Sequence, residues 1–259
     1  MTSKNPPHSA IARAELHRIE VRGQDLCADL MGQLGFTDYF LFLLTGQRPT
    51  VTLRRMVDAC LVAIAEHGLV PSVVAARMTL AAAPDALQGA VSAGLLGCGS
   101  VILGASETAG ELLGEVIARS QNGGTLSEAA WEVLTQLRTN GKSLPGFGHP
   151  IHREGDPRAA RLLELARELG VNGPHMAALA TIEAEVPSVW KRSLVLNVSG
   201  AIPAVLLDAG YPAAALRGIP LLARTGSLIA HLLEERSRPI GFALADAAAS
   251  AVVYDGSAA

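Results

Sequence analysis

Apolar residues recur every three or four positions along most of this chain, which is the spacing of amphipathic helices. In the segment TLSEAAWEVLTQLRTNG, residues 125–141, a tryptophan and two leucines fall on one face of such a helix. Thr125 and Glu128 have the spacing of a capping box, in which each side chain bonds the backbone N–H of the other residue. The pattern therefore predicts a helix that begins after Thr125 and ends at the Asn-Gly pair.

A second helix is predicted to begin at Asp156-Pro157, because aspartate caps free N–H groups and proline suits the first helical position. Its leucines repeat at helical spacing as far as Gly170. Further helices are predicted over residues 53–66, 73–83, 108–119, 203–209 and 228–235. The sequence has no sustained strand alternation and no repeat, so the predicted fold class is all-α.

Two polar, glycine-containing breaks, SQNGG and VNGP, suggest how the chain is divided. We expect a small helical domain over residues 108–202, inserted between the two parts of a large helical domain, 23–107 and 203–259. Residues 1–22 are expected to form an N-terminal arm. The first ten residues are polar and contain two prolines, which is typical of a frayed arm and not of a signal peptide.

Composition also favours packed helices. The 259 residues are 49% hydrophobic and 4% aromatic, so leucine, alanine and valine must fill the core, whereas a β-sandwich would use more aromatic and β-branched residues. A net charge of −3, without a basic stripe, gives no reason to expect a nucleic-acid partner. Three scattered cysteines are too few for a disulfide framework or a CxxC metal site, so a cytoplasmic location is expected.

The most apolar run of the sequence, residues 91–105, is short and is interrupted by four glycines. A membrane-spanning helix needs about 20 consecutive apolar residues. The sequence is therefore interpreted as that of a soluble protein without a membrane partner.

Polar groups crowd into one segment, GFGHPIHREGDPRA. Gly146 and Gly148 allow a tight loop whose backbone N–H groups can approach a ligand. His149 titrates near neutral pH and can pass protons, while Arg158 has the planar fork that binds a carboxylate. Arg153, on the loop, suits a phosphate. The segment predicts an anion site with an acid–base group beside it.

Other interpretations of the polar residues stay open. His149 can equally be a surface or structural histidine, and the two arginines can be solvated. His149, His152 and Asp156 resemble part of a metal site, but a fourth ligand is missing, so no metal is predicted. Cys98 is interpreted as a small core residue, and His231, with the glutamates that follow it, as a domain contact or a surface face.

Five segments, in order along most of the chain, resemble motifs of the citrate synthase family, which includes citryl-CoA lyases and the lyase module of ATP-citrate lyase. Short bacterial chains described as citryl-CoA lyases are similar in length as well. The segments are AEHG at 65–68 with Ser72 and AAR at 75–77, GSVILGASE at 99–107, GFGH…DPR at 146–158, NVSG at 197–200 with GYP at 210–212, and Arg224, Gly226, AH at 230–231 and RP at 238–239.

The resemblance implies a citrate synthase-like fold, with a cleft between a large and a small helical domain, and a homodimer. It implies that His67 and His149 hold a 2-oxo or 2-hydroxy acid. Arg158 and Arg224 would bind the carboxylates of this acid, and Arg238 would reach in from the partner subunit.

The resemblance further implies coenzyme A as the acyl carrier. Arg153 would meet one of its phosphates, and residues 144–148, including Gly146 and Gly148, would lie near its adenine. Lys142 is assigned to the same cofactor site.

Two positions depart from the family pattern. Citrate synthases carry a thioester-polarising histidine where this chain has Ile102, and a catalytic aspartate where it has Ser199. Isoleucine cannot donate a hydrogen bond, and serine is a weak base without an activating group. Removing a general base costs about 10²–10⁴ in rate, so efficient citrate synthesis is not expected.

We therefore expect a CoA-dependent carbon–carbon lyase or synthase that acts on citryl-CoA or a related 3-hydroxy-3-carboxyacyl-CoA. In the cleavage direction His149 is the candidate base for the hydroxyl proton, and Ser199, a water or His67 would return a proton to the acetyl group. Two alternatives stay open. They are the same fold acting on a different carboxylated substrate, and a non-catalytic binder of a carboxylate or an acyl-CoA.

Overall fold

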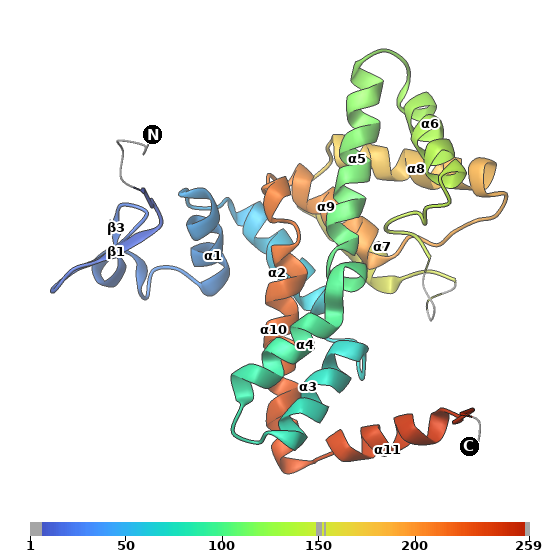
Figure 1. Ribbon diagram of the computed structural model, residues 1–259. Coiled ribbons are helices and arrows are strands. Elements are labelled where there is room, and N and C mark those ends of the chain that lie inside the picture. Colours follow the sequence, from blue (N-terminus) through green and yellow to red (C-terminus); the bar gives the residue numbers. More distant parts are fainter. Residues whose placement is uncertain (1–6, 149–151, 153, 257–259) are drawn as a thin grey trace, which may run out of the picture.

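The computed structural model describes residues 7–148, 152 and 154–256, and most of them are helical. The predicted all-α fold class is confirmed. Within the described residues the α-helices are α1 (Phe36–Thr45), α2 (Val51–Ala65), α3 (Pro71–Ala82), α4 (Leu87–Leu103), α5 (Ala105–Gln121), α6 (Leu126–Thr139), α7 (Pro157–Glu168), α8 (Pro174–Trp190), α9 (Val198–Asp208), α10 (Gly218–Ser237) and α11 (Gly241–Ala251). Figure 1 shows α5, α6 and α8 at one end of the molecule and α3, α4 and α11 at the other.

Three short strands precede the helices, where the sequence predicted only an arm. β1 (Ala12–Ala14), β2 (Ile19–Val21) and β3 (Gln24–Asp25) form an antiparallel sheet in that order, followed by a π-helical turn, Leu26–Leu30. Strands of two or three residues are too short for an alternating pattern to register. The sheet packs with α1 around its own small apolar cluster and projects to one side in Figure 1.

Both helix starts that were predicted from capping residues are confirmed. Thr125 and Glu128 form the two bonds of the capping box at the start of α6. The carboxylate of Asp156 caps α7, and Pro157 is its first residue. These local signals work because the capping side chains bond N–H groups within three residues of themselves.

The predicted start of a helix at Pro203 is wrong, because α9 begins at Val198 and Pro203 lies inside it. The side chain of Asn197 caps this earlier start. Helix α10 also begins well before residue 228, because packing stabilises a first half that contains glycine and proline of low helix propensity. Helices α1, α4, α8 and α11 were not predicted. The apolar residues of α4 and α8 do not form one stripe.

Helix α10 belongs to both of the larger hydrophobic clusters. Its first half, with Ile219, joins the main cluster, which also contains buried residues of α2 and α5 to α9. Its second half, with Leu228, joins a smaller cluster with α3 and α4. The main cluster includes residues on both sides of the boundaries proposed at 108 and 203, and that division of the chain stays a prediction.

One helical run among the described residues, Leu87–Gln121, is long and apolar enough to cross a membrane by length and composition. It consists of α4 and α5, of 17 residues each, and α4 is interrupted at Gly99, where φ is 53°. A spanning helix needs about 20 residues. Helix α4 packs on α3 and α10, and α5 packs on α6 and α9, so we interpret the run as two packed helices.

The carboxylate of Asp208, at the end of α9, holds the start of α8. It accepts hydrogen bonds from the backbone N–H groups of Gly173, His175 and Met176, and contacts Nδ1 of His175 at 2.8 Å. The residue before α8 is a glycine, so a side-chain cap has to come from elsewhere in the chain. This contact holds the start of α8 against the end of α9.

Replacing Asp208 by alanine should lower the free energy of unfolding by about 2 kcal/mol or more, because several N–H groups lose their acceptor at a buried position. Urea denaturation would measure the loss. Asp246→Ala, at an exposed position of α11, is the matched control and should change stability by less than about 0.5 kcal/mol. Equal effects of the two changes would contradict the capping role.

Candidate active site

The ends of several helices surround one cavity of about 360 Å³. Four of the predicted site residues line it: His67 after α2, Arg158 in α7, Ser199 in α9 and Arg224 in α10. The remaining lining residues, most of them apolar, are Ile64, Val70, Pro71, Ile102, Leu103, Ser106, Asn197, Val198 and Pro220. The cavity thus combines two guanidinium groups and an imidazole with an apolar wall.

His67 lies in the turn that ends α2. The carboxylate of Glu66 accepts the backbone N–H groups of His67 and Gly68, at 2.9 and 2.6 Å. Gly68 has a φ of 72°, a conformation that other residues rarely adopt, and so lets the chain reverse here. The His67 ring lies with its centroid 5.9 Å from that of His152.

The surroundings of His67 disfavour its charged form. Partial burial lowers the pKa of this imidazole, and the positive charges of Arg158 and Arg224, together with His152, act in the same direction. Asp156 opposes the shift more weakly. His67 is therefore a neutral ring near pH 7, able to donate one hydrogen bond and to accept a proton.

Arg158 is held by a carboxylate from its own helix cap. Asp156 accepts hydrogen bonds from Nε and Nη2 of Arg158, at 3.0 and 2.9 Å, and from the backbone N–H of Val198 at 2.9 Å. Burial alone would raise the pKa of Asp156, but the bonds from Arg158 and Val198 lower it. The carboxylate thereby joins the start of α7 to the start of α9 and sets Arg158 beside Ser199.

Gly146, in the GFGH segment, allows close packing against α9. A Cβ at Gly146, where φ is 80°, would lie 2.6 Å from Cα of Gly200. Asn197 donates its backbone N–H to Gly146 and its side-chain N–H to Gly148. The N–H of Gly148, which we expected to face a ligand, instead donates to the carbonyl of Val195 at 2.7 Å.

Arg224 enters the cavity from the middle of α10, between the two hydrophobic clusters that this helix joins. Its Nη1 donates to the carbonyl of Ala65 at 3.4 Å, which links it to the end of α2. Burial lowers the pKa of Arg224, and the nearby charge of Arg158 acts in the same direction. Two guanidinium groups close together favour an anion with more than one carboxylate.

Both positions that depart from the family pattern, Ile102 and Ser199, line the same cavity. Ile102 follows the kink of α4 at Gly99 and is 40% exposed. Its neighbours in the wall include Leu103 and Val70, so this side of the cavity is apolar. The backbone N–H of Ser199 donates to the side-chain oxygen of Asn197.

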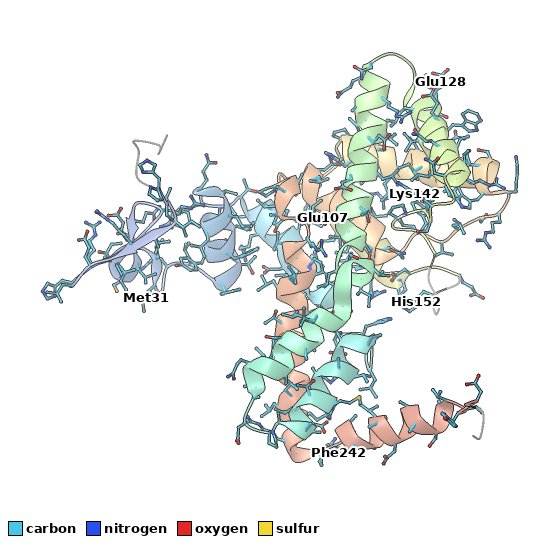
Figure 2. The ribbon with its side chains drawn as sticks, in the orientation of Figure 1. Met31, Glu107, Glu128, Lys142, His152 and Phe242 are labelled. Carbon is cyan, nitrogen blue, oxygen red and sulfur yellow. The ribbon has the colours of Figure 1, made fainter. Side chains whose placement is uncertain are left out.

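Two other predicted site residues, Lys142 and Arg238, do not line this cavity. Lys142 is exposed and lines a separate cavity of about 480 Å³, and Figure 2 shows it apart from His152. The Arg238 side chain is 82% exposed and lies 3.9 Å from Glu234. The roles assigned to both stay predictions. His149 and Arg153 lie outside the described residues.

His152 was assigned no role beyond a partial metal site, yet it lies beside His67. The polar segment in which His152 lies was the only sequence signal for this residue. Sequence alone does not show that its neighbour in the fold is His67, at the end of α2. Across the described part of the chain, no group of three or more His, Cys, Asp or Glu side chains is arranged to hold a metal ion.

The family model of the citrate synthase C-terminal domain matches residues 8–241. The chain belongs to the citrate synthase family. The citrate synthase of Heyndrickxia coagulans is 28% identical over 205 residues, which are 78% of this chain and 52% of that protein. This member of the citrate synthase family thus spans about half the length of the curated relatives it matches.

Solved structures of the family include chains of similar size. The citryl-CoA lyase from Hydrogenobacter thermophilus has a TM-score of 0.85 and 30% identity, covering 98% of this chain and 96% of that one. The ATP citrate lyase from Methanothrix soehngenii, solved with citrate and coenzyme A, has a TM-score of 0.78 and 21% identity, covering 100% of this chain and 43% of that one. The second likeness concerns the fold alone.

The positive charge of Arg224 should have a measurable effect on the pKa of His67. Replacing Arg224 by glutamine should raise the pKa of His67, because a positive charge that disfavours the imidazolium is removed. Histidine NMR titration would measure the shift. Arg217→Gln, which removes a charge at the start of the same helix beside Glu107, is the control and should leave His67 unchanged. A pKa of His67 that stays constant in Arg224→Gln would refute the coupling.

Proposed function

We propose that this protein is a CoA-dependent carbon–carbon lyase or synthase of citrate synthase type, acting on citryl-CoA or a related 3-hydroxy-3-carboxyacyl-CoA. The observation that carries the proposal is the convergence of Arg158, Arg224 and His67 on one cavity. Membership of the citrate synthase family and the similarity to a citryl-CoA lyase over nearly the full length of both chains support it.

The two guanidinium groups would bind carboxylates of the substrate. Asp156 accepts hydrogen bonds from two nitrogens of Arg158, and these bonds fix the plane of its guanidinium group. A fixed fork loses little conformational entropy when it binds a carboxylate. The carboxylated half of the substrate would therefore lie between the starts of α7 and α9 and the middle of α10.

Cleavage needs one proton to leave and one to return. The hydroxyl of a citryl group would give up its proton as the carbon–carbon bond breaks, forming a 2-oxo acid, and the electrons of that bond would pass to the thioester's methylene carbon. Protonation of this carbon gives acetyl-CoA, so the reaction is balanced without water or a redox partner. Neutral His67 can take the hydroxyl proton, as can the candidate base His149.

Coenzyme A is proposed as the acyl carrier, with Arg153, Lys142 and the loop at Gly146 and Gly148 as its candidate contacts. The likeness to an ATP citrate lyase solved with citrate and coenzyme A agrees with this proposal. The cavity lined by Lys142 is also lined by two glutamates, Glu111 and Glu115, whose negative charges would repel a phosphate. It therefore suits the adenine or the ribose of coenzyme A better than a phosphate.

A different acyl group is the second candidate. Ile102, Leu103 and Val70 give the cavity an apolar wall where citrate synthases have a hydrogen-bond donor. Burying each additional methylene against such a wall is worth about 0.8 kcal/mol. This observation favours thioesters with a longer apolar chain than acetyl. Comparing the cleavage of acetyl, propionyl and butyryl analogues distinguishes a site for acetyl from a site for a longer acyl group.

The test is incubation of the purified protein with citryl-CoA, with release of oxaloacetate and acetyl-CoA followed over time. Cleavage is expected, and Arg224→Gln should lower kcat/KM about 10- to 100-fold by removing charged hydrogen bonds to the substrate. Arg217→Gln is the matched control. If the protein binds oxaloacetate but cleaves no thioester of either kind, the non-catalytic alternative replaces the proposal.

We also propose a homodimer. In a single chain, only 33% of an apolar 18-residue stretch within α4 and α5 is buried, so most of this apolar stretch is not covered. Leu96 and Val101 of α4, Leu233 of α10 and Phe242 of α11 are all more than half exposed. Large exposed apolar surface of this kind marks an interface. Arg238, exposed at the end of α10, would then serve the site of the other subunit.

Analytical ultracentrifugation would measure the oligomeric state. The wild-type protein is expected to be a dimer, and Leu233→Glu should dissociate it, because a charge would be buried at the interface. Val62→Glu, at an exposed position of α2, is the control and should leave the dimer intact. A monomeric wild-type protein at micromolar concentration would contradict the proposal.

A further inference from the structure

A chain of hydrogen bonds leads from the interior of the α3–α10 pair to the turn that carries His67. It begins at Arg77 of α3, a 3% exposed side chain whose Nε donates to Glu235 at 2.7 Å. Nη1 of Arg77 lies 3.3 Å from Nδ1 of His231. Nε2 of His231 lies 2.9 Å from Oε2 of Glu66, the residue before His67.

Arg77 fixes the direction of every bond in this chain. A guanidinium group has donors only, so Nδ1 of His231 must accept. A neutral imidazole that accepts at Nδ1 carries its hydrogen on Nε2, and therefore donates to Glu66. A ring with hydrogens on both nitrogens would instead turn an Nδ1–H toward the N–H groups of Arg77. The neutral Nε2–H tautomer of His231 satisfies both contacts.

Glu66 uses both carboxylate oxygens to join α10 to the turn after α2. Oε2 accepts from Ser227 at 2.6 Å as well as from His231. Oε1 accepts the backbone N–H groups of His67 and Gly68. The Glu66 side chain is 52% exposed, so little packing restrains it, and the bonds from α10 select its rotamer.

We propose that His231 and Glu66 are positioning residues for His67. His231, as the neutral Nε2–H tautomer, orients the carboxylate of Glu66, and Glu66 holds the backbone of His67 so that the ring lines the cavity. The inference rests on the proposed function, in which His67 binds the substrate. Neither His231 nor Glu66 lines the cavity, so both act through His67.

Two substitutions of His231 distinguish its contact with Arg77 from its contact with Glu66. Asparagine at 231 places an acceptor near the position of Nδ1 and can keep the bond from Arg77, but it is too short to reach Glu66. Glutamine at 231 extends an amide N–H to about the position of Nε2 and can keep the bond to Glu66. His17→Asn, an exposed histidine of the N-terminal segment, controls for the loss of a histidine.

The first measurement is NMR of the protein labelled with ¹⁵N-histidine, in which the signals lost on substitution identify His231 and His67. The Nε2–H tautomer is expected for His231 near neutral pH. The His67 signals should move in His231→Asn and stay close to wild type in His231→Gln, with unchanged thermal melting in both. An Nδ1–H tautomer or a protonated His231 would overturn the proposal.

The second measurement is function of the same proteins. His231→Asn should lower kcat/KM for citryl-CoA cleavage, or the affinity for oxaloacetate measured by calorimetry, about 10- to 100-fold, the loss expected from a small displacement of a binding group. His231→Gln should keep most of it. If His231→Asn and His231→Gln lose function alike, or lose it with their melting temperature, His231 only holds the fold and the proposal fails.

The two proposals fail in different ways. A wild-type protein that cleaves no thioester, yet shows the expected tautomer and the His67 displacement in His231→Asn, would reject the proposed function and keep the positioning role. If His231→Asn and His231→Gln cleave citryl-CoA as well as the wild-type protein does, the positioning role is rejected and the proposed function is kept.

Discussion

The site depends on one buried carboxylate. Asp156 caps α7, holds the guanidinium group of Arg158 and accepts the first N–H of α9 at Val198. These bonds fix two helix starts against each other and with them Arg158 and Ser199. Burial of an unpaired carboxylate is costly, so the arrangement depends on its four N–H donors, three from Arg158 and one from Val198. The position of Arg158, a proposed carboxylate-binding residue, is therefore set by the fold.

Burial and nearby positive charge both disfavour the charged form of His67. Burial lowers the pKa of His67, and Arg158 and Arg224 act in the same direction, so the ring is neutral where a substrate carboxylate would meet the two arginines. A neutral imidazole can exchange a proton with a hydroxyl group, whereas an imidazolium could only donate. The relay through His231 and Glu66 extends the same control to the backbone of His67.

The two departures from the family pattern change one half of the cavity. The proposed carboxylate-binding residues His67, Arg158 and Arg224 line the cavity. Ile102 and Ser199 line it as well, at the positions where the family pattern has a donor and a base. The consequence is an apolar wall that offers a thioester carbonyl no side-chain hydrogen bond from position 102.

The sequence by itself determined the helical fold class, the caps of α6 and α7, and the membership of His67, Arg158, Ser199 and Arg224 in one site. Caps act within three residues, and family motifs carry their order in the chain, so both can be read without coordinates. The tertiary structure alone decided that α9 begins before Pro203, that Gly148 donates to Val195, and that His152 lies beside His67. Each of these depends on contacts between segments far apart in the chain, and no local pattern encodes which helix ends will meet.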